Sequence, residues 1–529
     1  MTADHAWWQR GVIYQIYPWS FRDLDGDGIG DLKGIESELD YLKWLGVDAI
    51  WISPIYPSPM ADFGYDISDY CDVDPRFGTL ADFDSLLASA HRLGLKVILD
   101  YVPNHTSDQH PWFESSRSSR TSPQRDFYLW RDPAPGGGPP NNWLSEFGGP
   151  AWELDARTGQ YYYHAYLKQQ PDLNFRNPDV RRELLNVLRF WLERGVDGFR
   201  IDTIHHLIKD DQYRDNPENP QYVAGMPPHR RVIRRFTTDR PEVHEAIAAM
   251  RGVVDAYPDR VLIGEVHLPL PRLMTYYGTD LSGLHLPFNF QLLNAKWQST
   301  VIADLARQYE QSLPSGAWPN WVLGNHDTSR IASRVGLEQA RVAGLLLLTL
   351  RGTPTLYYGD ELGMRDVPIA PERVRDPFEK NVPGLGLGRD PERTPMQWSN
   401  EPNAGFGNAT PWLPIAADAA RVNVAAERDD PSSSLTFFRA LLGLRRAQPA
   451  LSVGSFRLLD VGPELLAFER AFDGKALTVV LNFSRAEQAV PLVGFTPQNL
   501  LLSTNPQRQL GALYEPLILA ADEGVLLGP

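Results

Sequence analysis

Four carboxylates each follow a short apolar run that is typical of a buried strand. They are Asp100, Asp202, Glu265 and Asp327. If these strands are parallel neighbours in one sheet, they end at the same edge, so we expect the four side chains on one rim. Carboxylates held so close together repel one another, and a structural role seldom requires four of them. We therefore interpret them as a catalytic group.

Hydrolysis of a glycosidic bond requires two carboxyl groups, one protonated and one ionised. Arg200 and Asp202 leave their strand on the same side, because strand side chains alternate with a period of two. The guanidinium is expected to lower the pKa of Asp202, which suits a nucleophile. Glu265 has no cation next to it in the sequence, so we expect a raised pKa, which suits a general acid. Taken alone, Arg200 and Asp202 fit a structural ion pair equally well.

The elements that must position these residues alternate between strand-like and helix-like patterns. The predicted strands are 12–16, 48–52, 97–101, 198–202, 261–265, 284–286, 321–324 and 355–358. Helical patterns between them include 34–45, 80–93 and 178–195. Eight strands that alternate with helices predict an α/β fold of the (β/α)8 TIM-barrel type, whose sites lie at the C-terminal ends of the strands.

Two further units interrupt or follow this barrel. Residues 105–170 are rich in Ser, Pro, Gly and aromatic residues and predict an inserted subdomain after the third strand. The catalytic barrel then comprises 1–104 and 171–453. Short strands separated by turn residues predict a C-terminal antiparallel β-sandwich over 454–529.

Composition excludes several classes of protein. The formal net charge of −15 argues against a nucleic acid or an anionic membrane as partner. The single cysteine, Cys71, rules out an intramolecular disulfide. The start of the chain lacks the pattern of a signal peptide, and no apolar run approaches the roughly 20 residues of a membrane span. We expect a cytoplasmic protein, a monomer or a weak homo-oligomer, acting on a small molecule.

The motifs around the carboxylates resemble the four signature segments of the α-amylase family, glycoside hydrolase family 13. They are Asp-Tyr-Val-Pro-Asn-His at 100–105, Gly-Phe-Arg-Ile-Asp at 198–202, Gly-Glu-Val at 264–266 and Gly-Asn-His-Asp at 324–327. The segment at 170–174 resembles a fifth one, typical of the α-glucosidase and oligo-1,6-glucosidase branch. The resemblance implies that Asp202 is the nucleophile, Glu265 the general acid/base and Asp327 the stabiliser of the transition state.

The same resemblance implies a set of sugar-binding residues. They are Asp62, Tyr65, Asp100, His105, Arg200, Thr203, His326 and Arg389. A salt bridge between Asp62 and Arg389 would close the site around a terminal glucose, with Arg393 as the other candidate for the arginine. This predicts an exo-acting, retaining α-glucosidase that cleaves short α-glucosides through a covalent glucosyl-Asp intermediate, a mechanism compatible with transglucosylation. Retention predicts that the carboxyl groups of Asp202 and Glu265 lie about 5–5.5 Å apart.

Thr203 bears on the choice of linkage. In the branch that this chain resembles, Val at this position accompanies α-1,6 linkages, and Thr or Ala accompanies α-1,4 linkages. We therefore predict a preference for α-1,4 linkages. The difference in free energy between the two linkages is about 1–3 kcal/mol, because Thr and Val at this position differ by a group the size of a methyl. The neighbouring His205 and His206 fit either a wall of subsite +1 or an ordinary loop.

Other activities remain open at this stage. Within the branch they are oligo-1,6-glucosidase, sucrose hydrolase and trehalose-forming isomerase. A non-catalytic binding module associated with transporters is a more remote alternative.

A loop after the first strand has the spacing of a calcium site. Its candidate ligands are Asp23, Asp25, Asp27, the carbonyl of Ile29, and Asp31. Acids at every second position with Gly at the sixth match the first half of a calcium loop, but Gly34 stands where a bidentate Glu is expected at the twelfth. The alternative is an Asx-rich loop without metal. We expect a structural Ca²⁺.

Overall fold

Eight parallel strands carry the predicted catalytic residues at their ends. The computed structural model describes residues 5–491, 499–513 and 516–529. The strands are β1 (Ile13–Ile16), β2 (Ala49–Ile52), β3 (Lys96–Tyr101), β7 (Gly198–Ile201), β8 (Val261–Gly264), β9 (Leu286–Pro287), β10 (Asn320–Val322) and β11 (Thr353–Tyr357). Their order is β10-β11-β1-β2-β3-β7-β8-β9. All neighbours are consecutive barrel strands except β11 and β1, the last and the first, and the inserted segment lies between β3 and β7 in the chain. The predicted TIM-barrel fold is confirmed.

Side chains rather than a backbone ladder join β9 and β10, the sixth and seventh strands of the barrel. Asn320 in β10 donates from its side chain to the carbonyl of Pro287, and its Oδ1 accepts from the backbone N–H of Asn289 at 3.0 Å. β9 is only two residues long and lies later than the predicted 284–286. Pro287 lacks an N–H, which limits further ladder bonds here.

The period of two along the strands separates an inner from an outer core. Trp51 and Ile98 belong to the cluster that fills the barrel interior, whereas Leu99 and Phe199 pack outward against the helices. This alternation directs Arg200 into the barrel. The functional side chains at the strand ends therefore lie directly above the buried apolar residues that fill the barrel.

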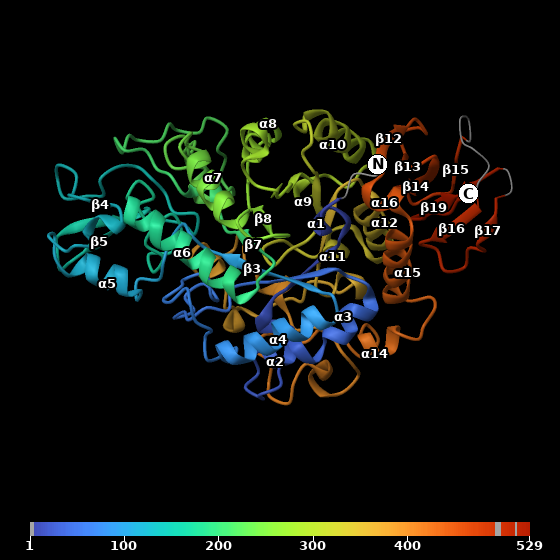
Figure 1. The fold of residues 1–529 in the computed structure, drawn as a ribbon, viewed down its shortest axis with the longest axis horizontal. Helices are drawn as coiled ribbons and strands as arrows, with labels where there is room; N and C mark the ends of the chain where they lie inside the picture. Colours follow the sequence, from blue (N-terminus) through green and yellow to red (C-terminus); the bar gives the residue numbers. More distant parts are fainter. Residues whose placement is uncertain (1–4, 492–498, 514–515) are drawn as a thin grey trace.

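The main helices pack around this barrel (Figure 1). They are α2 (Leu32–Ser37), α3 (Leu39–Leu45), α4 (Leu80–Arg92), α6 (Pro178–Arg194), α7 (Val243–Val254), α10 (Ser299–Ser312), α12 (Leu337–Thr349) and α15 (Ser434–Ala447). Shorter ones are α1 (Trp7–Arg10), α5 (Pro111–Ser118), α8 (Leu270–Leu273), α9 (Gln291–Asn294), α11 (Ile331–Val335), α13 (Pro377–Asn381), α14 (Val424–Glu427) and α16 (Pro449–Val453). The single helix predicted over 34–45 is in fact two, because Glu38 leaves helical geometry at φ −105° and ψ 8°.

The inserted segment and the C-terminal strands lie at opposite ends of the long axis (Figure 1). The insertion contains α5 and a small sheet of β4 (Trp130–Arg131), β5 (Trp152–Asp155) and β6 (Gln160–Tyr163), in the order β4-β6-β5. Its own apolar cluster includes Trp143, Trp152 and Tyr163. The insertion therefore has a small core of its own beside the end of β3.

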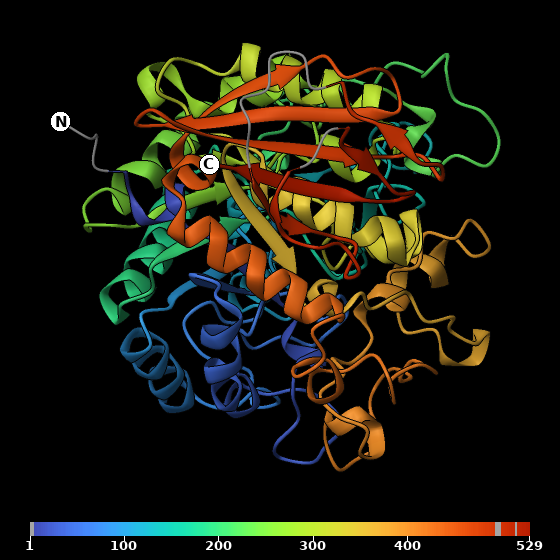
Figure 2. The same cartoon turned by 90° about the vertical axis from the view of Figure 1, so that its right-hand side faces the viewer.

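An antiparallel sheet forms the C-terminal unit and lies beside α15 (Figure 2). Six strands pair in the order β12-β13-β14-β19-β16-β17, and two more, β15 and β18, form a second sheet. Their bounds are β12 (Ser455–Leu459), β13 (Leu465–Phe472), β14 (Lys475–Asn482), β15 (Gln488–Ala489), β16 (Asn499–Ser503), β17 (Gly511–Ala512), β18 (Ile518–Leu519) and β19 (Gly524–Gly528). Val480 and Leu519 belong to one buried cluster formed by strands of the two sheets. Residues 492–498 and 514–515 of the predicted sandwich lie outside the described residues.

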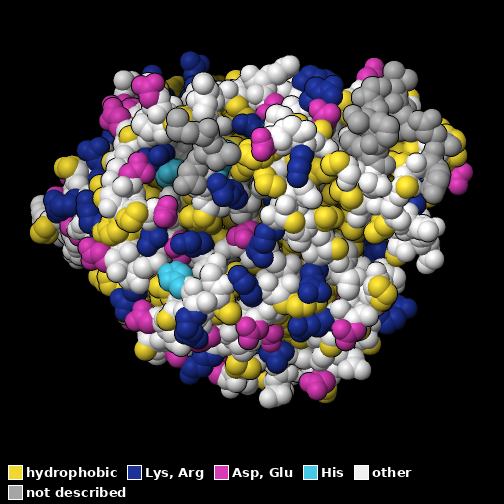
Figure 3. Space-filling model, turned by 45° about the vertical axis from the view of Figure 1, so that its right-hand side comes forward, with side chains coloured by type: hydrophobic (Ala, Val, Ile, Leu, Met, Phe, Trp, Pro, Cys, Tyr) yellow, Lys and Arg dark blue, Asp and Glu magenta, His cyan; other side chains and the backbone are white. Residues whose placement is uncertain are grey.

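Positive and negative side chains are interspersed over the face drawn in Figure 3. Within the described ranges, none of the helices combines the length and the apolar character needed to cross a membrane.

Candidate active site

Arg200 binds three of the predicted carboxylates at once. Its Nη1 donates to Asp100 Oδ1 at 2.7 Å and to Asp202 Oδ1 at 2.8 Å, and its Nη2 donates to Glu265 Oε2 at 2.7 Å. Only 1% of the arginine side chain is exposed. One fully desolvated guanidinium therefore joins the ends of β3, β7 and β8, and its planar fork sets the spacing of both catalytic candidates.

The prediction of a raised pKa for Glu265 is wrong. Besides Arg200, the Nε2 of His267 lies 2.7 Å from Glu265 Oε1, and the backbone N–H of Thr203 donates to Oε2 at 2.9 Å. Burial raises the pKa of Glu265, but Arg200 and His267 outweigh burial and hold this pKa well below its usual value. Neighbours in the sequence could not reveal that Arg200, which comes from β7, contacts Glu265 at the end of β8.

The pKa values of the other two carboxyl groups bound by Arg200, those of Asp202 and Asp100, are raised instead. The prediction of a lowered pKa for Asp202 is wrong as well: burial and then the facing Glu265 carboxylate raise this pKa well above its usual value and outweigh Arg200. Burial likewise raises the pKa of Asp100 to about 6. Three carboxyl groups share one guanidinium, so a proton within the group relieves their repulsion, and the group titrates as a unit.

Tyr65 and His326 form the floor next to this group. Tyr65 Oη donates to Asp100 Oδ2 at 3.1 Å and lies 2.8 Å from His326 Nε2. The two rings stack with their centroids 5.5 Å apart at an angle of 8°. Burial lowers the pKa of His326 to about 3, so the imidazole is neutral at pH 7. Gln15, which the sequence did not single out, lies 2.7 Å from its Nδ1 and orients the ring.

Two arginines hold Asp327. Arg389 Nη1 lies 3.1 Å and Arg393 Nη2 2.7 Å from its Oδ1. Burial raises the pKa of Asp327, but His326 and then the arginines outweigh burial and place this pKa well below its usual value. Asp327 is therefore ionised at neutral pH, as the stabiliser of a cationic transition state must be.

A salt bridge closes one end of the site. Arg389 Nη2 lies 2.7 Å from Asp62 Oδ1 and 2.7 Å from Asp376 Oδ1. Arg393 does not contact Asp62 and instead donates to the carbonyl of His326 at 2.6 Å. The structure thus pairs Asp62 with Arg389, the first of the two candidates. Asp376, which accepts both Arg389 Nε and Nη2, was not predicted because it lies in a loop without periodicity.

His105 and Gln170 complete this closed end. His105 Nε2 lies 3.1 Å from the carbonyl of Tyr65 and 3.2 Å from Gln170 Nε2. Gln170 in turn donates to Asp62 Oδ2 at 3.3 Å. Burial lowers the pKa of His105 to about 4, so it is neutral at pH 7. Gln170 belongs to the segment at 170–174 that resembles a fifth signature, so this segment contacts the closed end of the site directly.

The site as a whole is a cavity of about 620 Å³, lined by the closed end and by several histidines. His205, His206 and His267 line it, as do His229 and the ion pair between Arg234 and Glu146. His205 and His206 are each 2% exposed. Within the part of the chain that the structure describes, the Nδ1 atoms of both have no hydrogen-bond partner. The two histidines thus line the cavity.

Thr203 connects the nucleophile candidate to these histidines. Its Oγ1 donates to Asp202 Oδ2 at 3.2 Å, and its backbone adopts φ 40°. A left-handed conformation is costly for a β-branched residue and is found where the surroundings enforce it, often at functional sites. Here it aims the N–H of Thr203 at Glu265.

The acidic loop after β1 brings together three of its predicted ligands. Carboxylate oxygens of Asp23, Asp25 and Asp27 lie within 4.8 Å of one another. Burial and then Asp27 raise the pKa of Asp25. Asp31 lies outside this group: its Oδ1 caps α2 through the N–H of Gly34, and its Oδ2 accepts the N–H of Leu24 at 2.7 Å. The loop thus offers three carboxylates to a cation, with Asp31 as a structural support.

A (β/α)8 barrel with a carboxylate pair at the C-terminal ends of its strands is the arrangement that a glycoside-processing enzyme requires. Residues 15–454 match the family described as "Alpha amylase, catalytic domain". The chain is 43% identical to a probable alpha-glucosidase of Rhizobium meliloti, covering 94% of this chain and 93% of that protein. It is 39% identical to an oligo-1,6-glucosidase of Parageobacillus thermoglucosidasius, covering 91% of each.

Among solved structures, an alpha-glucosyl transfer enzyme, XgtA, superposes with a TM-score of 0.94 at 42% identity, covering 99% of this chain and 100% of that one. The chain belongs to the α-amylase family, glycoside hydrolase family 13, in its α-glucosidase and oligo-1,6-glucosidase branch. It is a glucosidase, and the resemblance seen in the sequence is confirmed.

Proposed function

We propose that this enzyme is an exo-acting, retaining α-glucosidase that releases terminal glucose from short α-glucosides and prefers α-1,4 linkages. The observation that carries the proposal is the salt bridge between Asp62 and Arg389 at 2.7 Å. Asp62 and Arg389 line the same cavity as Asp202 and Glu265, and we propose that the pair limits this end of the site to a single glucose unit. A closed end admits a non-reducing terminus and excludes the interior of a longer chain.

In the proposed reaction Asp202 attacks the anomeric carbon while Glu265 protonates the departing oxygen. Arg200 fixes both groups, and Asp327 faces the positive charge that grows on the sugar ring. The glucosyl-Asp202 ester forms as the glycosidic bond breaks. Glu265, now ionised, then removes a proton from water, and the ester is hydrolysed with net retention.

The mechanism requires the shared proton on Glu265, whereas the surrounding groups raise the pKa of Asp202 and lower that of Glu265, which favours the proton on Asp202. We propose that the bound sugar reverses this preference. Charge developing at the anomeric carbon stabilises the ionised Asp202, which already has donors in Arg200 Nη1 and Thr203 Oγ1. Because the pair titrates together, ionisation of Asp202 leaves the proton on Glu265.

The histidines of the cavity support transfer of glucose to alcohols other than water. His205, His206 and His267 line the cavity beside Asp202 and Glu265, where an acceptor in subsite +1 would lie. An acceptor held there competes with water for the glucosyl ester. We therefore propose transglucosylation alongside hydrolysis.

We propose a structural Ca²⁺ at Asp23, Asp25 and Asp27. The donor set fits a hard cation that prefers carboxylate oxygens, and the three acids repel one another without one. The ion would stabilise the loop after β1 and takes no part in the reaction.

Initial rates on maltose, isomaltose, sucrose and nitrophenyl α-glucoside, measured side by side, test the proposed specificity. Maltose should exceed isomaltose in kcat/KM by about tenfold, since a methyl-sized change is worth about 1–3 kcal/mol. Faster cleavage of isomaltose would identify an oligo-1,6-glucosidase. Faster cleavage of sucrose, or conversion of maltose mainly into trehalose, would replace the proposed function by that activity.

A further inference from the structure

A buried ion pair lies next to the closed end of the active site. Lys209, in the loop after β7, contacts Asp172 Oδ2, and only 2% of the lysine side chain and 0% of the aspartate side chain are exposed. Desolvation of two charges is costly and offsets much of their attraction, so the pair is weak evidence for a role in stability. Neither residue is among those that line the active-site cavity. Any influence of the pair on the reaction must therefore pass through a neighbour.

Asn104 connects this pair to His105. Lys209 Nζ donates to Asn104 Oδ1 at 2.8 Å, and because an ammonium group is only a donor, the atom that accepts from it is the amide oxygen. The amide nitrogen therefore faces Asp172 Oδ2 at 2.9 Å and His105 Nδ1 at 3.1 Å. A flipped amide would bring its nitrogen to the ammonium group and its oxygen to the carboxylate. The ion pair thus fixes the orientation of the Asn104 side chain.

The fixed amide determines which nitrogen of His105 carries the proton. The imidazole is neutral at pH 7, because burial lowers its pKa to about 4. Its Nδ1 accepts from Asn104, so the proton is on Nε2. The surroundings of Nε2 favour opposite tautomers: the Tyr65 carbonyl at 3.1 Å favours a proton there, and the amide nitrogen of Gln170 at 3.2 Å disfavours it. The contact of Nδ1 with Asn104 therefore settles the tautomer.

The Nε2 edge of His105 lies on the side of the active-site cavity. His105, Tyr65 and Gln170 line this cavity, whereas Asn104 and Asp172, on the Nδ1 side, do not. With its proton on Nε2, the imidazole presents a hydrogen-bond donor to the closed end of the site.

We infer that Lys209 is a positioning residue for sugar binding: through Asn104 it holds His105 in the tautomer that donates from Nε2 to a hydroxyl group of the terminal glucose. The inference rests on the proposed function, which places that glucose in the closed end. Asp172 assists, because it accepts one amide hydrogen of Asn104 and leaves the other for His105. Without the ion pair the amide is free to flip, and His105 then adopts either tautomer.

Glucose analogues, used as competitive inhibitors of the hydrolysis of nitrophenyl α-glucoside, test this inference. For each hydroxyl group, one analogue has hydrogen in its place and another has fluorine, which accepts a hydrogen bond but cannot donate one. At the hydroxyl that His105 binds, the deoxy analogue should inhibit the wild type about three- to tenfold more weakly than glucose, the effect of losing one hydrogen bond. The fluoro analogue should lie between the two. His105→Ala should not distinguish the three inhibitors, which identifies the hydroxyl.

The variants that release the imidazole should change the result at this one position. In Lys209→Met the fluoro and deoxy analogues should inhibit equally, because the donor is no longer held on Nε2, and the differences at the other hydroxyl groups should remain. Asn104→Ala keeps the ion pair but removes its link to His105, and it should give the same result. Lys209→Met combined with Asp172→Asn removes both charges and carries the same prediction if the single variant does not fold.

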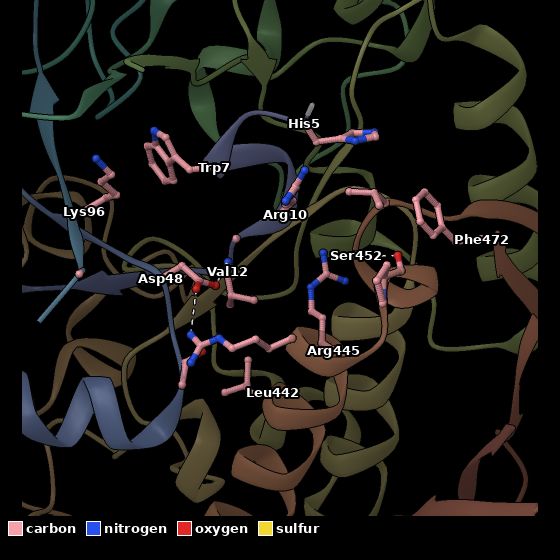
Figure 4. A pocket seen from close by; sticks show the side chains of 16 residues that line it. His5, Trp7, Arg10, Val12, Asp48, Lys96, Leu442, Arg445, Ser452 and Phe472 are labelled. Atoms are coloured by element: carbon pink, nitrogen blue, oxygen red, sulfur yellow. Dashed lines mark hydrogen bonds and ion pairs between the residues drawn. The ribbon is translucent and has the colours of Figure 1, made fainter. Parts of the chain in front are cut away.

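Lys96→Met is the matched control. Lys96 pairs with Asp197 at 3.0 Å at the other end of β3 from Asn104, where it lines a separate cavity (Figure 4). This variant should give wild-type inhibition constants. An equal loss of affinity for glucose and all analogues in Lys209→Met, or the wild-type pattern in both Lys209→Met and Asn104→Ala, would overturn the inference. A wild-type enzyme that does not hydrolyse nitrophenyl α-glucoside would instead refute the proposed function.

Discussion

The imidazole of His267 lies 2.7 Å from Glu265, Nε2 to Oε1, at the open side of the site. Its ring stacks on Phe290 with centroids 4.5 Å apart, and 47% of its side chain is exposed. It therefore contacts the proposed general acid from the exposed side of Glu265. With Arg200 it holds the pKa of Glu265 well below its usual value, after burial has raised it.

Replacing His267 should change the pH dependence of the reaction. A general acid must be protonated, so activity is lost as pH rises through its pKa. His267→Ala removes a group that lowers the pKa of Glu265, so the basic limb of kcat/KM should move upward by about one pH unit. His267→Gln retains a donor and should shift it less. A basic limb that stays in place in His267→Ala would show that the contact does not tune the acid.

Loss of the closed end should weaken binding of terminal glucose. Asp62→Asn removes the charge that pairs with Arg389, and contacts between charged groups are worth about 1.5–3 kcal/mol. We expect kcat/KM on maltose to fall by about 10- to 150-fold, mainly through KM. The control is Asp84→Asn, which breaks an exposed pair with Arg194 and should leave activity unchanged. An Asp62→Asn enzyme with wild-type KM would argue against a closed end formed by this pair.

Thr203→Val tests the assignment of linkage preference. The substitution removes the hydroxyl that contacts Asp202 at 3.2 Å and replaces it with a methyl group of similar size. The ratio of kcat/KM for maltose to that for isomaltose should fall by about tenfold, within the range available to a methyl-sized change. Unfolding measurements should accompany the rates, because residue 203 stays at φ 40° in either variant. An unchanged ratio would mean that linkage is selected elsewhere.

Calcium removal should lower stability without altering the reaction. At 100 times its dissociation constant, a bound ion contributes about 2.7 kcal/mol to folding, which corresponds to a Tm higher by a few degrees. Protein freed of calcium should therefore melt earlier and recover on addition of Ca²⁺. In Asp25→Asn the recovery should be weaker. Identical melting of calcium-free and calcium-loaded protein would favour an acidic loop without metal.

The positions of the catalytic carboxylates could be predicted because each ends a strand with a clear apolar pattern. The protonation states of these carboxylates could not be predicted from the sequence, since they depend on side chains that come from other strands. His267 is a partial exception: it lies two residues after Glu265, and the spacing that placed Arg200 beside Asp202 indicates the same relation here. Asp376 gave no such signal, because its contact with Arg389 joins two points of an irregular loop.

The stereochemistry of the first product tests the central claim most directly. Proton NMR during the first minutes of hydrolysis shows which anomer of glucose is released, before mutarotation mixes the two. A covalent glucosyl intermediate on Asp202 with Glu265 as acid and base predicts that α-glucose appears first from maltose. Initial release of β-glucose would contradict this mechanism, and with it the assignment of Asp202 as nucleophile.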